Sequence, residues 1–134
     1  MSYHKVEVTP VAGALGATIS GVNLNKDLDD LVALDIEKAL LEYQVIFFRN
    51  QDITPEVHKL LGSRFGALEK HPILPHLENH PEIVVLDSAA SHPKVEEWHT
   101  DLTYEKHPPL GSILHCKIAP QKGGDTLWAS MSAA

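Results

Sequence analysis

The residues best suited to chemistry stand together at positions 98–101, where the sequence reads Trp-His-Thr-Asp. If this segment is a strand, the side chains of His99 and Asp101 point to the same face, with Cα atoms about 6.5–7 Å apart. An imidazole nitrogen and a carboxylate oxygen on that spacing can converge on one divalent ion at about 2.0–2.2 Å. A second histidine from a distant strand would complete a two-histidine, one-carboxylate face, which leaves positions open on iron(II) for dioxygen and a chelating cosubstrate.

The same residues allow simpler interpretations. A His-x-Asp tripeptide arises easily by chance in a chain with nine histidines and 18 acidic residues. Asp101 could cap a turn while His99 packs against Trp98, and neither role needs a metal. A zinc-dependent hydrolase that uses His99, Asp101 and a third histidine is another interpretation. A cupin-like protein that binds an anion or a metal without chemistry is a further one.

The composition excludes several other classes of protein. Of the 134 residues 43% are apolar, which is typical of a globular domain. The formal net charge is −7 and lysines and arginines are not clustered, so we expect neither nucleic acid nor membrane as a partner. No apolar run reaches the ~20 residues of a membrane span, and no secretory signal opens the chain. The single cysteine, Cys116, forms no internal disulfide, and the sequence predicts a cytoplasmic protein.

The elements that must position the candidate residues follow from the hydrophobic pattern. Apolar residues at helical spacing predict a helix over residues 30–43, with aspartates at its start. Thr54 and a following proline predict the start of a second helix, which Gly66 can end. Several further segments alternate in polarity or are wholly apolar, as strands are: residues 5–10, 17–22, 45–48, 83–86, 98–103 and 112–118.

Two segments are expected to be irregular. Residues 70–81 contain three prolines and three histidines, and residues 87–97 form a polar stretch that predicts a mobile loop. His76 and His80 have the spacing of a zinc pair on a helix, but prolines flank them, so a structural role is favoured. We expect Cys116 to be a small core residue on a strand.

Taken in order, the motifs resemble the taurine dioxygenase family. Residues 98–101 are followed by two prolines at 108–109 and by residues 123–128, which read Gly-Gly-Asp-Thr-Leu-Trp. The amino-terminal half agrees at residues 45–49 (Val-Ile-Phe-Phe-Arg) and at the Phe-Gly pair of residues 65–66. The resemblance covers essentially the whole chain, and the combination of His-x-Asp with a downstream Gly-Gly-Asp-Thr is highly specific.

The resemblance implies an iron(II)- and 2-oxoglutarate-dependent dioxygenase, with an α+β fold in which helices flank a double-stranded β-helix (jelly-roll) core. His99 and Asp101 become iron ligands, Thr126 a contact to a carboxylate of 2-oxoglutarate, and His71 a contact to the sulfonate of the substrate. The implied reaction uses dioxygen to hydroxylate a small anionic substrate such as an alkyl sulfonate or alkyl sulfate. It releases sulfite or sulfate, an aldehyde, succinate and CO2, and the enzyme could be a homo-oligomer.

The chain also departs from the taurine pattern. Leu74 and Val95 stand where the taurine enzymes have a tyrosine and an asparagine, so two hydrogen-bonding groups are replaced by apolar ones. We therefore expect a substrate less polar than taurine, such as a longer alkyl sulfonate or an alkyl sulfate ester. The family's second histidine ligand and its 2-oxoglutarate-binding arginine have no counterpart here, and residues 129–134 look like the start of an interrupted helix. The sequence thus predicts that residues 1–134 are the amino-terminal part of a single catalytic domain.

Overall fold

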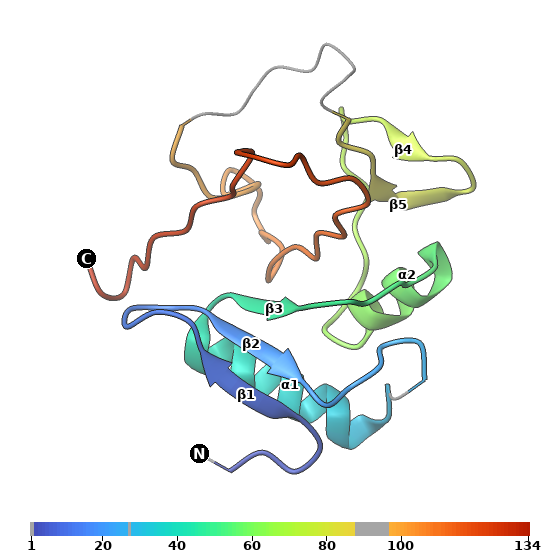
Figure 1. Cartoon of the computed structure of the whole chain (residues 1–134). Helices are drawn as coiled ribbons and strands as arrows, with labels where there is room; N and C mark the ends of the chain where they lie inside the picture. Colours follow the sequence, from blue (N-terminus) through green and yellow to red (C-terminus); the bar gives the residue numbers. More distant parts are fainter. Residues whose placement is uncertain (1, 27, 88–96) are drawn as a thin grey trace. The chain divides into compact units, whose positions relative to one another are not determined.

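The computed structural model describes two helices and five short strands within residues 2–26, 28–87 and 97–134 (Figure 1). The chain divides into two compact units. The first unit consists of residues 1–57 and 115–134, and the second consists of residues 58–114. No helix in the described parts of the chain is long and apolar enough to cross a membrane.

The first unit is built on a three-stranded sheet. Strand β1 (Glu7–Pro10) pairs antiparallel with β2 (Ala17–Ser20), and β2 pairs parallel with β3 (Ile46–Phe48). A parallel pair needs a crossover connection, and helix α1 (Asp30–Tyr43) supplies it and packs against β2 and β3 (Figure 1). Sheet and helix bury the apolar residues that form the core of this unit, among them Ala17, Ile19, Val32, Ile36 and Ala39.

Helix α1 has the bounds that the sequence predicted, because local signals set both of its ends. Asp29 caps the first turn, and its Oδ1 accepts a hydrogen bond from the backbone N–H of Val32 at 2.9 Å. The helix ends where Gln44 adopts a φ of 65°, and the N–H of Gln44 closes the last turn on the carbonyl of Leu40 at 2.7 Å. The helix therefore needs little help from its neighbours to define its length.

The carboxylate of Asp35 ties the amino-terminal segment to α1. Its side chain is buried, and Oδ2 accepts hydrogen bonds from the backbone N–H groups of His4 and Lys5, each at 2.7 Å. Burial alone would raise the pKa of Asp35, but these two N–H donors outweigh it and hold the pKa below its ordinary value. The charged form of Asp35 is thus part of the folded core.

An ion pair within the second unit joins a helix to a hairpin. Helix α2 (Pro55–Ser63) begins at the proline that the sequence indicated, and its residues from His58 onward belong to the second unit. At its start Thr54 Oγ1 accepts the N–H of Val57 at 3.3 Å. Strands β4 (His76–Leu77) and β5 (His80–Val84) form an antiparallel hairpin. Lys59 of α2 lies 2.9 Å from Glu82 of β5.

The carboxy-terminal strand predictions are wrong. Residues 98–103 and 112–118 were expected to be strands, yet the described residues 97–134 contain neither helix nor strand. An alternating pattern makes a strand only where a neighbouring strand satisfies its backbone groups, and none pairs with these segments among the described residues. Cys116 is exposed instead of buried, so its expected core role is also wrong.

Of the other predictions about the fold, some are confirmed, some are partly wrong and some stay untested. The α+β class and the strands at β1, β2 and β3 are confirmed, with somewhat shorter bounds than predicted. The run at 83–86 belongs to a strand that starts three residues earlier, and part of the segment expected to be irregular forms the hairpin. The described residues show no jelly-roll core, which stays a prediction, and most of the predicted mobile loop, residues 88–96, lies outside them.

Candidate metal centre

His99 and Asp101 lie side by side in the second unit. Nε2 of His99 is 3.2 Å from Oδ1 of Asp101, and both side chains are more than half exposed. The backbone between them is irregular and enters a turn at Asp101, where Leu102 has a φ of 51° and its carbonyl accepts the N–H of Glu105 at 3.0 Å. The two side chains therefore converge because the chain turns, and not through the strand alternation that the sequence suggested.

The carbonyl of Glu97 orients the imidazole. It lies 2.8 Å from Nδ1 of His99, and because a carbonyl can only accept, Nδ1 carries the proton and donates. In the neutral ring, the lone pair of Nε2 is then on the side of Asp101. Histidines that bind metals almost always donate their other ring N–H in this way, which fixes the tautomer and the ring orientation.

The same contacts favour the protonated ring when no metal is bound. The hydrogen bond from His99 to the Glu97 carbonyl raises the pKa of His99 above its ordinary value. The charge and hydrogen bond of Asp101 act in the same direction, and partial desolvation opposes them. A proton and a metal ion would therefore compete for Nε2, as they do at any histidine ligand.

The pair fits a small divalent ion. Two donor atoms that each bind an ion at about 2.1 Å and at right angles lie about 3.0 Å apart, close to the separation seen here. One imidazole and one carboxylate suit iron(II) and other first-row metals. Among the described residues, no group of three or more His, Cys, Asp or Glu side chains could hold a metal, so the pair is an incomplete ligand set.

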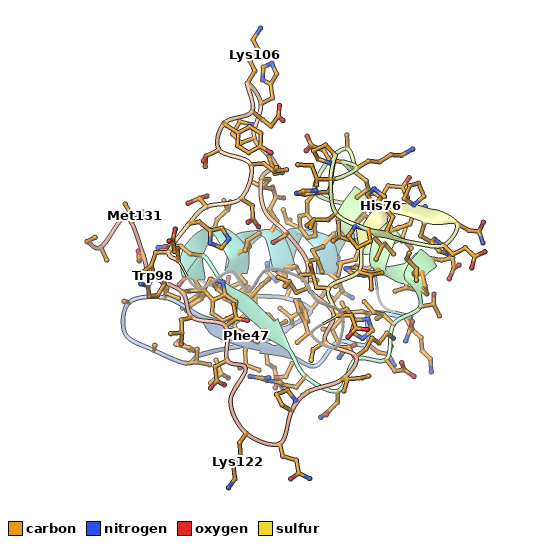
Figure 2. All side chains as sticks on the ribbon, turned by 90° about the horizontal axis from the view of Figure 1, so that it is seen from above. Phe47, His76, Trp98, Lys106, Lys122 and Met131 are labelled. Carbon is orange, nitrogen blue, oxygen red and sulfur yellow. The ribbon has the colours of Figure 1, made fainter. Side chains whose placement is uncertain are left out.

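The simpler interpretation of this segment matches the structure only in part, because a turn does begin at Asp101 but His99 has no buried tryptophan beside it. Trp98 (labelled in Figure 2) is exposed. With 71% of its surface accessible, it offers His99 no buried packing surface. The side chain of Asp101 faces His99. His76 and His80 lie on a hairpin and not on a helix, so the helical spacing of a zinc pair is absent there.

Thr126 lies in the first unit, on an irregular segment. It follows a turn in which Gly123 and Gly124 have φ values of 71° and 74°, a region that disfavours side chains with a Cβ. Two residues further on, the ring of Trp128 meets Phe47 of β3 edge to face, with ring centroids 5.4 Å apart. The turn and this aromatic contact hold the segment that carries the Thr126 hydroxyl.

His71 lies in the second unit and is half-buried. Its Nδ1 accepts the backbone N–H groups of Ile73 and Leu74 at 3.2 and 3.1 Å. Within the described part of the chain, no hydrogen bond or ion pair joins it to His99 or Asp101, so these three predicted residues are not brought together by direct contact. Val95, the second departure from the taurine pattern, lies outside the described residues.

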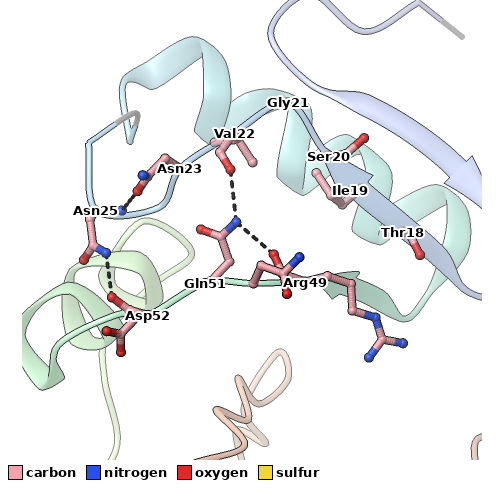
Figure 3. A pocket seen from close by; sticks show the side chains of 11 residues that line it. Thr18, Ile19, Ser20, Gly21, Val22, Asn23, Asn25, Arg49, Gln51 and Asp52 are labelled. Atoms are coloured by element: carbon pink, nitrogen blue, oxygen red, sulfur yellow. Dashed lines mark hydrogen bonds between the residues drawn. The ribbon is translucent and has the colours of Figure 1, made fainter.

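A cavity that the sequence did not predict lies between the ends of β2 and β3 (Figure 3). Its volume is about 500 Å3. Gln51 holds its walls together, since its Nε2 donates to the carbonyls of Val22 and Arg49 (Figure 3) at 3.1 and 3.2 Å. Its Oε1 accepts the N–H of Leu24 at 3.0 Å. None of the four predicted site residues lines this cavity. Its signal in the sequence is the polar run directly after the apolar strand, residues 49–52.

The backbone partners of the two histidines were also missed. The Glu97 carbonyl on His99 and the two N–H groups on His71 leave no trace in residue types, because every residue except proline carries the same backbone groups. The turn that brings Asp101 to His99 has no glycine to mark it either, since Leu102 occupies the left-handed position.

An oriented imidazole beside a carboxylate, on a small α+β chain, is a donor pair of the kind that mononuclear metal-binding proteins use. The chain belongs to the taurine catabolism dioxygenase TauD, TfdA family, whose family model matches residues 7–134. The resemblance seen in the sequence is thereby confirmed.

Two curated relatives span nearly all of the chain. It is 37% identical over 131 residues to an alpha-ketoglutarate-dependent sulfate ester dioxygenase of Pseudomonas putida, a match that covers 97% of this chain and 43% of the relative. It is 36% identical over 132 residues to an alkylsulfatase of Acinetobacter baylyi, with 98% of this chain and 41% of the relative covered. The chain therefore spans less than half the length of these relatives.

Two solved structures from Burkholderia xenovorans are similar. A putative alpha-ketoglutarate-dependent taurine dioxygenase matches with a TM-score of 0.53 and 42% identity, over 57% of this chain and 28% of that one. A taurine dioxygenase matches with a TM-score of 0.54 and 35% identity, over 58% of this chain and 28% of that one. More than half of this chain thus has the same fold as a part of these two structures.

Proposed function

We propose that the full protein is an iron(II)- and 2-oxoglutarate-dependent dioxygenase that hydroxylates a small anionic organosulfur compound. The observation that carries the proposal is the His99–Asp101 pair, whose imidazole is oriented by the Glu97 carbonyl. Two curated relatives act, by their names, on sulfate esters or alkyl sulfates, and both match over nearly the whole chain. An alkyl sulfate ester is therefore the favoured substrate, and an alkyl sulfonate the second choice.

His99 Nε2 and Asp101 Oδ1 would hold the iron, with a second histidine from outside residues 1–134 as the third ligand. A bound iron(II) supplies the oxidation chemistry, in which 2-oxoglutarate is converted to succinate and CO2 while one atom of dioxygen enters the substrate. The role of Glu97 is to keep the proton on Nδ1 so that Nε2 stays a ligand.

Thr126 would donate its hydroxyl to a carboxylate of 2-oxoglutarate, with an arginine from the remainder of the protein as the main countercharge. The glycine turn at residues 123–124 and the Phe47–Trp128 contact support this role, because both fix the segment that carries the hydroxyl. A cosubstrate carboxylate can then be held without rearrangement of the loop.

The substrate would be held by His71 at its anionic head and by apolar surface along its alkyl chain. Leu74 is half-buried and close to His71 in the chain, and its side chain cannot hydrogen-bond the amino group of taurine. Hydroxylation of the carbon that bears the sulfate gives an unstable hydroxyalkyl sulfate, which collapses to an aldehyde and sulfate. An alkyl sulfonate would yield an aldehyde and sulfite in the same way.

The first test is an anaerobic titration of iron(II) and 2-oxoglutarate into the full-length protein. We expect the weak visible charge-transfer band of the iron chelate, and its loss in His99→Ala. Aerobic incubation with hexyl sulfate should then release sulfate and succinate in equal amounts. Sulfate release without dioxygen and 2-oxoglutarate would identify a zinc-type hydrolase instead, and binding without any turnover would identify a cupin-like binding protein.

A further inference from the structure

We propose that Phe47 and Lys117 are positioning residues for 2-oxoglutarate: neither touches the cosubstrate, and together they hold both ends of the segment that carries Thr126. This Thr126 segment consists of residues 117–128. The inference rests on the proposed function, because it takes Thr126 as a contact to a carboxylate of 2-oxoglutarate. It adds the part of the fold that sets the affinity for that carboxylate, which is strand β3 and the loop after it.

The Thr126 segment has no regular backbone structure of its own. Its residues form neither helix nor strand, and within the part of the chain that the structure describes no backbone hydrogen bond joins it to the sheet. Its turn is compact, because a Cβ on Gly124 would lie only 3.0 Å from Cγ of Pro120. A segment without such backbone bonds moves unless side chains anchor it. The position of the Thr126 hydroxyl therefore depends on the contacts at the two ends.

Trp128 anchors the carboxy-terminal end. Its ring meets that of Phe47 edge to face, with centroids 5.4 Å apart and planes inclined by 73°. Phe47 lies opposite Thr18 in the register of β2 and β3. The residues on either side of Thr18, Ala17 and Ile19, are buried in the core that includes α1. Because side chains alternate along a strand, Phe47 and its contact with Trp128 lie on the face of the sheet away from α1.

The ring of Phe47 is itself held in place. The guanidinium carbon of Arg49 lies 5.5 Å from the ring centroid, as in a cation–π contact. Gly16 also approaches the ring, since a Cβ at this glycine would lie 3.6 Å from Cε2 of Phe47. A ring that is fixed in this way gives Trp128 a defined surface. Aromatic pairs contribute more than their buried area alone, so this contact is the stronger of the two anchors.

Lys117 anchors the amino-terminal end. Its Nζ donates to the carbonyl of Ile53 at 3.4 Å and lies 3.9 Å from Oδ1 of Asp52. Both partners belong to the loop between β3 and α2. The side chain of Lys117 is more than half exposed and that of Asp52 is fully exposed, and an exposed ion pair contributes little. Lys117 is therefore the weaker anchor.

Anchors at both ends restrict the Thr126 hydroxyl before the cosubstrate binds. The turn between the anchors has fewer conformations than a segment that is tied at one end only. The cost of ordering the segment is then met when the protein folds, so it does not reduce the affinity for the ligand. Binding of 2-oxoglutarate should therefore weaken when the Phe47 ring is removed, although the ring does not contact it.

The main experiment measures the dissociation constant of 2-oxoglutarate in the full-length, iron(II)-loaded protein without dioxygen, from the charge-transfer band of the chelate. Phe47→Leu removes the ring and keeps an apolar side chain, and it should raise the dissociation constant about fivefold. Lys117→Met keeps the stem of the side chain and should raise it about twofold.

Phe48→Leu is the matched control. Phe48 is the next residue of β3 and lies opposite Ile19, so it faces the α1 side of the sheet. The substitution should lower the unfolding midpoint, because it removes part of a packed aromatic side chain. It should nevertheless change the dissociation constant by less than about twofold, because it leaves the Thr126 segment anchored. Equal effects of Phe47→Leu and Phe48→Leu on this constant would show a general loss of stability and would overturn the inference.

A double-mutant cycle shows whether Phe47 acts through Thr126. In a Thr126→Val background the hydroxyl is absent, so Phe47→Leu should then change the dissociation constant by less than about twofold. Full additivity of the two substitutions would contradict the inference, and so would a Thr126→Val variant that binds 2-oxoglutarate as tightly as the wild type.

A measurement without iron or cosubstrate tests the anchors directly. In the full-length protein, amide hydrogen exchange of residues 118–127 should be at least about fivefold faster in Phe47→Leu and unchanged in Phe48→Leu. The same exchange rate in both variants would refute the anchoring and leave the proposed function in place. A wild-type protein that shows no band with iron(II) and 2-oxoglutarate would instead remove the proposed function, and with it the role inferred for Phe47 and Lys117.

Discussion

The Nε2 atom of His99 lies 3.2 Å from Oδ1 of Asp101, and the Glu97 carbonyl holds the opposite side of the imidazole at 2.8 Å. The histidine is thus oriented before any ion arrives, by the backbone of its own segment. A pair of this kind can bind a metal with little rearrangement, and both of its side chains are more than half exposed.

Asp101→Asn in the full-length protein should abolish tight iron binding and reduce turnover by at least about 100-fold, because the substitution replaces an anionic ligand with a weak neutral one. Thermal unfolding should change little, since the Asp101 side chain is exposed. Iron stoichiometry after desalting is the measurement. Retention of one tightly bound iron would show that Asp101 is not a ligand.

Thr126→Val removes the hydroxyl and keeps the shape of the side chain. We expect the KM for 2-oxoglutarate to rise about tenfold, because one hydrogen bond to a charged group is lost. Thr126→Ser is the matched control and should keep most of the affinity. Steady-state kinetics at saturating substrate separates the two, and equal KM values would exclude this contact.

Gly124→Ala should be more damaging than Gly123→Ala. Both glycines have positive φ values, so each alanine costs about 1–2 kcal/mol in backbone strain. A Cβ on Gly124 would in addition lie 3.0 Å from Cγ of Pro120, whereas Gly123 has open space. The unfolding midpoint in urea and the KM for 2-oxoglutarate should both shift further for Gly124→Ala. Equal shifts would mean that the neighbouring proline moves aside freely.

The buried Asp35 carboxylate predicts an acid-sensitive core. Because the folded-state pKa of Asp35 lies below that of the unfolded chain, its contribution to stability is fully present above the unfolded pKa of about 3.9. This contribution is lost as the pH falls through the folded-state pKa. Urea unfolding of the full-length protein between pH 7 and 2.5 should show the decline.

Asp35→Asn should flatten that decline and lower the free energy of unfolding at pH 7 by about 2 kcal/mol, since two hydrogen bonds to a charged acceptor are weakened. Glu37→Gln, an exposed change on the same helix, is the control and should have little effect. A wild-type pH profile that Asp35→Asn leaves unchanged would show that other groups cause the acid sensitivity.

Secondary structure was predictable from the sequence wherever the backbone hydrogen-bond partners of a segment lie within that same segment. Helix α1 satisfies its backbone within the helix, and its Asp29 cap lies in the same stretch, so periodicity and capping sufficed to predict residues 30–43. Strand β5 begins and ends earlier than the predicted strand at residues 83–86, and residues 98–103 form no strand. Both predictions failed because the backbone hydrogen-bond partners of a strand lie elsewhere in the chain.

The sequence by itself determined the family, and it predicted the metal ligands His99 and Asp101 and the anion contacts His71 and Thr126, which stay predictions. Only the tertiary structure decided how the ligand pair meets and which nitrogen of each histidine carries the proton. Nδ1 of His99 donates to the Glu97 carbonyl, whereas Nδ1 of His71 accepts two backbone N–H groups. Both outcomes depend on the path of the backbone, since backbone donors and acceptors are alike in nearly every residue and only the folded chain places them.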